Sequence, residues 1–191
     1  MPDLPNVTAA VESLVAALAE GKFEYAIMGG LAVVLHGHKR YTQDVDALVW
    51  DLDERLESLL GVLEKKGFRP ASPNQVAVAR SARILHLLAT DGTEVDIFLG
   101  FLPFEREAVD RAVTMSLAGG ESVRVTSVEN VIIMKLIASR KRDRSDIVAL
   151  LDLYPGINLD RVRSIVSDYA DALDDPKLLD SLNDFAPKDE S

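Results

Sequence analysis

Residues 23–50 constrain the fold of this chain more than any other segment. The apolar start of this segment is typical of a short buried strand, and it ends at the glycine pair Gly29 and Gly30. The apolar run after the glycines predicts a helix, which a polar loop connects to a second strand carrying Asp44 and Asp46. This order of strand, glycine turn, helix and strand predicts an α/β fold in which helices flank a small mixed β-sheet.

The two aspartates of the second strand suggest a metal site. Successive side chains of a strand point to opposite faces, so Asp44 and Asp46 share one face and present two carboxylates side by side. Two like charges held that close repel each other unless a cation lies between them. Mg²⁺ takes oxygen ligands and is often held by one or two carboxylates together with substrate phosphates. We therefore expect this pair to bind a divalent metal ion.

The glycine pair suggests an anion site beside the carboxylates. Exposed backbone N–H groups at the start of a helix favour negative charge, and glycine lets a ligand approach the backbone closely. Gly29 and Gly30 stand where a strand turns into a helix. A phosphate-binding turn that faces a metal-binding carboxylate pair suggests phosphoryl or nucleotidyl transfer.

Asp96 is the candidate for a third carboxylate. It lies between Val95 and Ile97 in the strand-like run EVDIFLG. Burying an unpaired carboxylate is costly, so an acid flanked by apolar β-forming residues suggests a functional partner. Glu94 shares the same face but is nearer the preceding turn, and we consider it the weaker choice. We expect Asp96 to face Asp44 and Asp46.

The remaining pattern predicts helices and strands along the whole chain. We expect helices over residues 6–20, 51–66, 102–112, 128–138, 143–153 and 158–172, and strands over residues 76–78, 84–89, 93–99, 112–117 and 122–125. Capping patterns place three helix starts, at Asp51 with Glu54, at Thr126 with Glu129, and at Asp143 with Asp146 in the first turn. Because only helices are expected after Ser127, we predict a catalytic domain over residues 1–126 and a helical C-terminal subdomain over residues 127–191.

Lys135 is unusual in its predicted helix. The helix is apolar almost all round, and Lys135 is its only charged residue between Glu129 and Arg140. Such a lysine either extends its methylene groups to the surface or points into a polar cleft. We favour the cleft.

Composition limits the classes of function. A net charge of −10 argues against broad, sequence-independent binding of nucleic acids, although Lys39–Arg40 and residues 140–144 are local islands of positive charge. There is no Cys, which excludes disulfides and thiolate metal sites.

The N-terminus has no export pattern and no apolar run reaches the ~18 residues of a membrane helix, so we expect a cytoplasmic protein. The three histidines, His36, His38 and His86, are too scattered to suggest a zinc site, and we expect structural or surface roles.

The ordered motifs resemble a known family. Met28-Gly29-Gly30, a gap of thirteen residues, Asp44-Val45-Asp46 and the later Asp96 resemble the signature of the nucleotidyltransferase (DNA polymerase β-like) superfamily. The segment KLIASRKRDRSDI, residues 135–147, resembles a motif of the AbiEii-type toxin branch, and the resemblance covers residues 23–151. One departure is that the superfamily often has Gly-Ser where this chain has two glycines. The gap before Asp44 is also long, and its loop, with Lys39–Arg40, is a candidate for gripping the substrate or for a lid.

The resemblance implies a nucleotidyltransferase-like fold and a metal-dependent enzyme that transfers an NMP from an NTP. It implies two Mg²⁺ ions, with Mn²⁺ as the alternative, held by Asp44, Asp46 and Asp96, of which Asp96 would also receive the proton of the acceptor. The nucleotide would contact Gly29, Gly30, Lys135 and Arg142. The AbiEii-like motif implies a toxin with a separately encoded antitoxin, and RNA or tRNA as the acceptor.

Two other functions fit the same residues. One is a nucleotide-binding or partner-binding module that keeps the fold without transfer activity. The other is a small-molecule adenylyltransferase of the aminoglycoside-modifying kind, for which the acidic net charge would suit a cationic substrate.

Overall fold

The computed structural model describes residues 7–50, 55–117, 119–183 and 185. Its strands are β1 (Tyr25–Met28), β2 (Asp44–Trp50), β3 (Arg69–Pro70), β4 (Ile84–Leu88), β5 (Glu94–Gly100), β6 (Val113–Ser116) and β7 (Ser122–Val125). Its helices are α1 (Thr8–Glu20), α2 (Gly29–Leu35), α3 (Leu56–Lys65), α4 (Gln75–Ala82), α5 (Pro103–Asp110), α6 (Val128–Ala138), α7 (Asp143–Leu153), α8 (Leu159–Leu173) and α9 (Lys177–Asn183).

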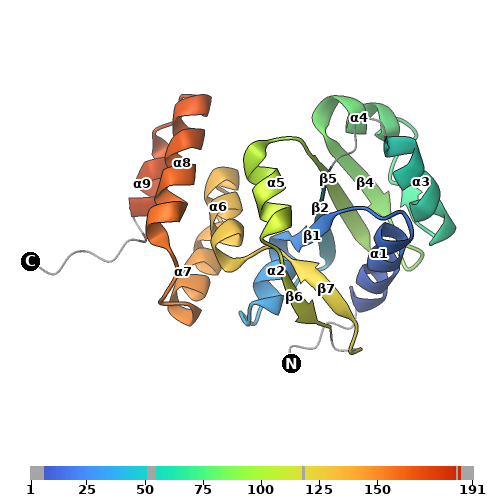
Figure 1. Ribbon diagram of the computed structural model, residues 1–191, viewed down its shortest axis with the longest axis horizontal. Helices are drawn as coiled ribbons and strands as arrows, with labels where there is room; N and C mark the ends of the chain where they lie inside the picture. The colour runs from blue at the N-terminus through green and yellow to red at the C-terminus, as the bar shows by residue number, and fades with distance from the viewer. Residues whose placement is uncertain (1–6, 51–54, 118, 184, 186–191) are drawn as a thin grey trace, which may run out of the picture.

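The strands described form one mixed sheet in the order β3-β4-β5-β2-β1-β7-β6 (Figure 1). The central strands β2 and β5 run parallel, whereas β1 is antiparallel to β2 and β4 is antiparallel to β5. The register of these four strands sets Met28, Asp46, Asp96 and His86 in one row across the sheet. The expected small mixed sheet flanked by helices is therefore confirmed, and its pairing brings residues from four separate strands together.

The two faces of the sheet are covered differently. Alternate residues of β2, namely Val45, Ala47 and Val49, are buried in the main hydrophobic core together with α1 and α3. On the opposite face, Leu48 packs with α5 in a smaller apolar cluster. Because side chains alternate along a strand, Asp44 and Asp46 share this second face with Leu48.

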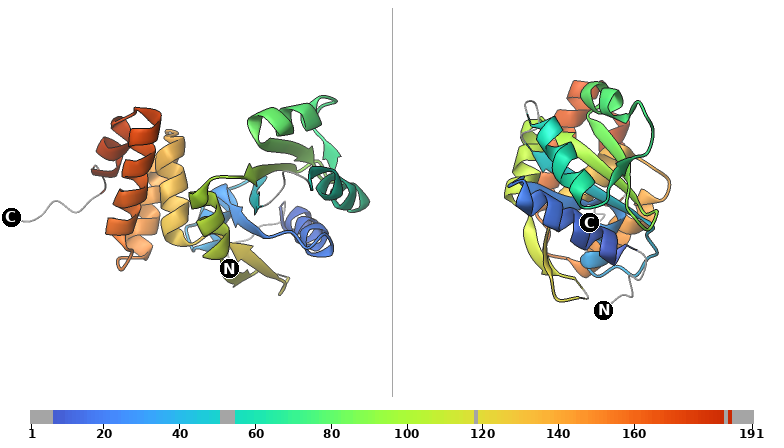
Figure 2. Two further views of the ribbon diagram at one scale, coloured as in Figure 1. Left: turned by 45° about the horizontal axis from the view of Figure 1, so that its top comes forward. Right: turned by 90° about the vertical axis from the view of Figure 1, so that its right-hand side faces the viewer.

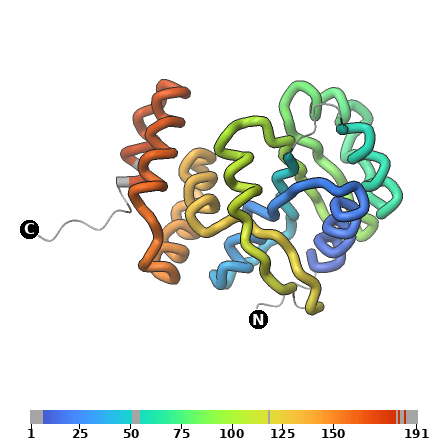
Figure 3. Tube along the Cα trace, in the orientation of Figure 1, coloured from blue at the N-terminus to red at the C-terminus, as the bar shows by residue number. Residues whose placement is uncertain are grey.

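The helices α6 to α9 gather at one end of the molecule, with α5 between α6 and the sheet (Figures 1 and 2). The trace in Figure 3 shows the chain completing its strands before it enters these helices. Arg161 of α8 ties them to α5, since its Nη2 donates to Glu107 at 2.9 Å and to Asn130 of α6 at 2.8 Å. All described strands lie before residue 127, but the division into domains 1–126 and 127–191 stays a prediction.

Three local predictions are wrong. Residues 76–78, expected as a strand, lie within α4. Two alternating valines are too short a pattern to outweigh the helix-forming alanines around them. The buried residues of the segment, Gln75 and Ala79, are four apart, which is the spacing of a helix. Ser127 rather than Thr126 caps α6, accepting from the Asn130 N–H at 3.4 Å, while the buried Thr126 hydroxyl donates to the Ile27 carbonyl.

Asp143 is the first residue of α7 instead of its cap, which falls at Arg142. The carboxylate of Asp143 instead accepts from the Arg140 N–H at 3.2 Å and from Lys135 Nζ at 2.8 Å, both on its N-terminal side. The predicted cap at Asp51 with Glu54 lies outside the described residues. Of the helices described, none has the length and apolar character needed to cross a membrane.

Candidate active site

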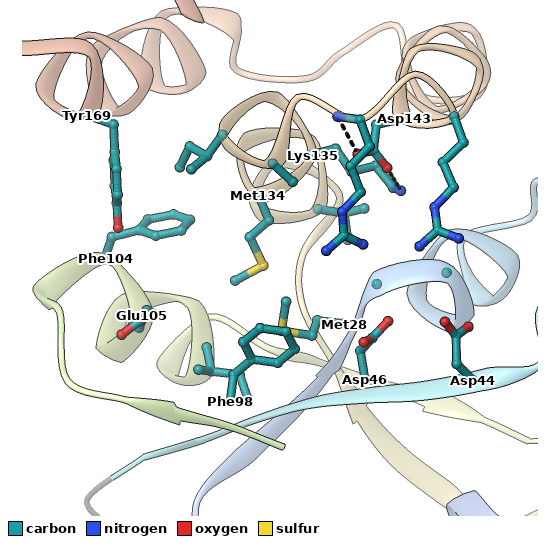
Figure 4. Close-up of a pocket in the computed structure, with 18 of the residues that line it drawn as sticks. Met28, Asp44, Asp46, Phe98, Phe104, Glu105, Met134, Lys135, Asp143 and Tyr169 are labelled. Atoms are coloured by element: carbon teal, nitrogen blue, oxygen red, sulfur yellow. Dashed lines mark hydrogen bonds and ion pairs between the residues drawn. The ribbon is translucent and has the colours of Figure 1, made fainter. Parts of the chain in front are cut away.

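Asp44 and Asp46 form the floor of a cavity of about 270 Å³ between the sheet and the C-terminal helices (Figure 4). Both side chains rise from β2 on the same face, as their spacing predicts. Asp46 also meets the first turn of α2, where its carboxylate lies against Gly29 and the nearby Gly30 N–H lowers the pKa of the carboxyl group. The two carboxylates are therefore held by strand geometry at the point where β1 turns into α2.

The pKa of Asp46 is raised from 3.8 to about 6. Burial is the largest cause, and the neighbouring charges of Asp44 and Asp96 raise it further. Arg140 and the Gly30 N–H act in the opposite direction. The surroundings of Asp46 therefore disfavour its ionised form. A bound cation would offset this cost, because it would stabilise the negative charge.

Gly29 is required by this arrangement. It has a φ of 64°, in the left-handed region that glycine adopts readily, and a Cβ at this position would overlap the carboxylate of Asp46. A Cβ at Gly30 would lie 2.8 Å from Thr42 Oγ1 and 3.1 Å from Arg40 Nη2. The glycine pair therefore leaves space for the Asp46 carboxylate, Thr42 and Arg40, and a phosphate contact at Gly29 and Gly30 stays a prediction.

Thr42 is a site residue that the sequence analysis missed. Its side chain is 6% exposed, and its Oγ1 donates to Asp44 Oδ1 at 2.9 Å. The hydroxyl lies next to Gly30, 2.8 Å from where a Cβ of that residue would be. It is therefore close to the place of the serine that the nucleotidyltransferase superfamily often has at this position. The loop between α2 and β2 thus supplies a hydroxyl that orients one carboxylate of the pair.

Asp96 lies directly opposite Asp46 in the parallel register of β2 and β5. Its Oδ1 is 2.6 Å from Nδ1 of His86 on the adjacent strand β4, and its side chain is not among those lining the cavity. His86, which we expected to be a structural or surface residue, therefore belongs to the surroundings of the site.

A divalent ion would be held by the carboxylate pair, because the described residues do not form a complete set of protein ligands. Within residues 7–50, 55–117, 119–183 and 185, no group of three or more His, Cys, Asp or Glu converges closely enough to hold a metal. Asp44 and Asp46 supply two hard oxygen donors on one face, and the open cavity above them leaves positions for phosphate oxygens and water. This arrangement is typical of Mg²⁺ sites that are completed by a substrate.

Cationic side chains face the carboxylates across the cavity. Arg140 and Arg142, from the loop between α6 and α7, line this side, and Arg40 lines the cavity beside the first turn of α2. Lys135 also lines the cavity, but its Nζ is 2.8 Å from Asp143 Oδ1 (Figure 4). The same Nζ is 2.6 Å from Asp146 Oδ2. The charge of the buried lysine is therefore already paired, and the arginines are the cations better placed to meet a ligand.

The cavity continues from the carboxylates into an apolar region. Phe104 and Tyr169 stand at its far side with their ring centres 5.8 Å apart, nearly perpendicular to each other. Glu105 is the acid of this region, and its Oε2 accepts from the backbone N–H groups of Phe101 and Leu102 at 2.9 Å each. The other walls are Met28, Leu48, Phe98, Leu102, Val131, Met134 and Ile137.

A polar groove lies on the other side of Asp44. Its volume is about 630 Å³, and it shares Arg40, Asp44 and Arg142 with the first cavity. Its remaining walls are residues 41–43 and the turn of residues 91–94 between β4 and β5. The carboxylate pair therefore stands where an apolar cavity meets an open polar groove.

Comparison with known proteins identifies the family of the chain. The family described as "Nucleotidyltransferase of unknown function (DUF6036)" matches residues 3–187. Comparison with curated protein sequences finds no match.

Solved structures of nucleotidyltransferases share the fold. The antibiotic-resistance factor ANT(2'')-Ia is 18% identical, with a TM-score of 0.64 over 88% of this chain and 94% of its own. An antigenic nucleotidyltransferase-like protein from Paracoccidioides brasiliensis is 20% identical, with a TM-score of 0.54 over 96% of this chain and 95% of its own. The lincomycin-bound lincosamide antibiotic adenylyltransferase LnuA is 15% identical, with a TM-score of 0.51 over 76% of this chain and 97% of its own. The fold is nucleotidyltransferase-like.

Proposed function

The chain belongs to the DUF6036 family of nucleotidyltransferases, and on this premise we propose that it transfers an NMP from an NTP to an acceptor hydroxyl. The observation that carries the proposal is the carboxylate pair, Asp44 and Asp46, set opposite the arginine-lined side of the cavity. The raised pKa of Asp46 supports it, because an uncompensated acid pair is costly unless it serves a ligand.

Asp44 and Asp46 would hold the metal, Mg²⁺ or Mn²⁺, with two ions as the resemblance implies. A metal bound there would neutralise charge on the triphosphate and lower the pKa of the attacking hydroxyl. Thr42 fixes the direction of one carboxylate through its hydrogen bond to Asp44. The protein's contribution is therefore mainly to position charged groups, as expected for transfer of a phosphoryl-type group.

The nucleobase would occupy the apolar part of the cavity. Its flat ring suits walls such as Phe98, Phe104 and Met134, which exclude water but offer large contact surfaces. The phosphates would then lie between the carboxylates and the arginines, with Arg142 as a direct contact and Gly29 allowing close approach.

The acceptor would approach over β5. Asp96 of β5 is paired with Asp46 of β2 in the sheet, and α2 follows β1 on the other side of β2. Asp96 therefore lies on the side of Asp46 that is away from the proposed phosphates. His86 orients its carboxylate, and Asp96 would receive the proton of the acceptor hydroxyl or complete a metal site when substrate binds.

The acceptor class is the open part of the proposal. RNA or tRNA fits the basic residues 140–144 and the AbiEii-like motif, which also supports a toxin with a separately encoded antitoxin. A small-molecule acceptor is the second candidate, favoured by the acidic net charge, which would attract a cationic substrate.

The test is to incubate the protein with each NTP labelled at the α-phosphate, Mg²⁺ or Mn²⁺, and separate pools of total RNA, protein and small metabolites. Label in one pool would identify the acceptor, and its loss in a folded Asp44→Asn, Asp46→Asn double variant would assign the reaction to this site. No label in any pool with either metal would favour the binding-module alternative. Growth arrest on expression of the native chain, but not of the double variant, would support the toxin role.

A further inference from the structure

Arg40 connects the two parts of the chain at the cavity. It belongs to the loop between α2 and β2, and its Nη1 is 2.5 Å from Oδ2 of Asp146 in α7. The other end of the same guanidinium lies beside the first turn of α2, where Nη2 would be 3.1 Å from a Cβ built on Gly30. The guanidinium of Arg40 therefore contacts α7 of the C-terminal helices at one end and lies beside the start of α2 at the other.

Asp146 is placed to anchor this arginine. Its side chain is 3% exposed, and the same Oδ2 accepts from Lys135 Nζ at 2.6 Å. Lys135 also binds Asp143, and Nε2 of His38 lies 3.9 Å from Asp146 Oδ1. The buried Lys135 and the partly buried Arg40, whose side chain is 19% exposed, therefore balance the two buried carboxylates, so Asp146 can hold Arg40 without leaving an unpaired charge.

The contacts of Arg40 leave part of its guanidinium for a ligand. Nη1 serves Asp146, and Nε lies 3.3 Å from the Tyr41 carbonyl oxygen. Nη2 lies beside Gly30, 3.1 Å from where a Cβ of that residue would be, and Arg40 lines the cavity there. A phosphate entering beside Gly30 would therefore meet the guanidinium of Arg40, whose planar donors match phosphate oxygens well.

We propose that Arg40 binds the pyrophosphate portion of the incoming nucleotide and that Asp146 is the positioning residue that holds Arg40 for this contact. This inference rests on the proposed nucleotidyl transfer and adds two residues to it. An arginine fixed in advance by a buried carboxylate loses little side-chain freedom when phosphate binds, so the anchor contributes to affinity without touching the ligand. It also makes nucleotide binding depend on α7.

The test is equilibrium binding of inorganic pyrophosphate and of a non-hydrolysable ATP analogue, each with Mg²⁺. The proteins compared are the native chain, Arg40→Gln, Arg40→Lys, Asp146→Asn and the Arg40→Gln, Asp146→Asn double variant, with melting temperatures as the check on folding. Arg80→Gln is the matched control, because it removes an arginine from an exposed ion pair with Glu57, away from the cavity. Asp146→Asn keeps an oxygen that can accept from Lys135, and Arg40→Lys keeps the charge but shortens the reach.

We expect Arg40→Gln to weaken binding of both ligands by about tenfold or more, as loss of a charged hydrogen bond does. Asp146→Asn should weaken it in the same direction, and the double variant should bind no more weakly than Arg40→Gln alone. Arg40→Lys should bind more weakly than the native protein at an unchanged melting temperature. If the double variant binds as well as Arg40→Gln, the two losses are not additive, and Asp146 acts through Arg40. General damage to the fold by Asp146→Asn would instead add to the loss caused by Arg40→Gln.

Two results would overturn the inference. Equal binding by the native chain and Arg40→Gln would remove Arg40 from the site, and an additive loss in the double variant would remove the positioning role of Asp146. Both leave the proposed function standing, since the native chain still binds nucleotide. If the native chain binds neither ligand with Mg²⁺ or Mn²⁺, the proposed function fails, and this inference fails with it.

Discussion

Replacing Asp46 by Asn should stabilise the folded protein at neutral pH. The pKa of Asp46 is raised from 3.8 to about 6, so between these values the folded state holds a proton that the unfolded state has released. Stability therefore falls as the pH rises through this window, and the full penalty is present above about pH 6. A shift of about two pKa units corresponds to roughly 3 kcal/mol, and partial exposure of the site reduces the expected gain to roughly 1–3 kcal/mol.

The assay is denaturant-induced unfolding at pH 4 and pH 8 in the presence of a chelator. Asn keeps an oxygen that can accept from the Gly30 N–H, so the change removes charge with little effect on packing. Glu64→Gln, on the exposed part of α3, is the matched control for loss of one carboxylate. We expect Asp46→Asn to gain stability at pH 8 and almost none at pH 4. No gain at pH 8, or an equal gain at both pH values, would refute the electrostatic argument.

Three further substitutions test the local geometry. Thr42→Val should lower the rate of nucleotide transfer by about tenfold at an unchanged melting temperature, because it removes the hydroxyl that orients Asp44, and Thr42→Ser should restore the rate. Gly29→Ala should destabilise the fold by at least about 1 kcal/mol in denaturant unfolding, since it combines a left-handed φ with overlap of the neighbouring carboxylate. Lys135→Met should cost about 3–5 kcal/mol in the same assay, because it leaves Asp143 buried without its ammonium partner; a loss below about 1 kcal/mol would contradict this.

The sequence predicted the parts of the site that depend on local order. The apolar run before Gly29 and the alternation around Asp44 and Asp46 carry their own geometry, so strand, turn, helix and strand appear where they were expected. The cost of burying a lone acid in a strand marked Asp96 as an acid with a partner, and the structure pairs Asp46 with Asp96 in register, but the contact of Asp96 is His86 and its role in the site stays a prediction. These inferences need only the period of a strand and the electrostatics of a carboxylate.

What the sequence did not reveal depends on contacts between distant segments. Arg40 and Asp146 are 106 residues apart, and neither residue type nor spacing marks them as partners. The pairing of His86 with Asp96 follows from the register of two antiparallel strands, which a sequence read one segment at a time does not fix. Thr42 was hidden for a different reason, because a threonine in a polar loop is ordinary until its hydroxyl is seen beside Asp44.

The central claim, that Asp44 and Asp46 hold a metal with the nucleotide, is tested most directly by Mn²⁺ binding measured with electron paramagnetic resonance. The native chain and the Asp44→Asn, Asp46→Asn double variant would be titrated with and without a non-hydrolysable NTP analogue. We predict that the analogue makes the native chain bind Mn²⁺ more tightly, and that the double variant loses at least about tenfold in affinity, as expected when coordinating oxygens are removed. Equal Mn²⁺ binding by both proteins, or no effect of the analogue on the native chain, would contradict the account.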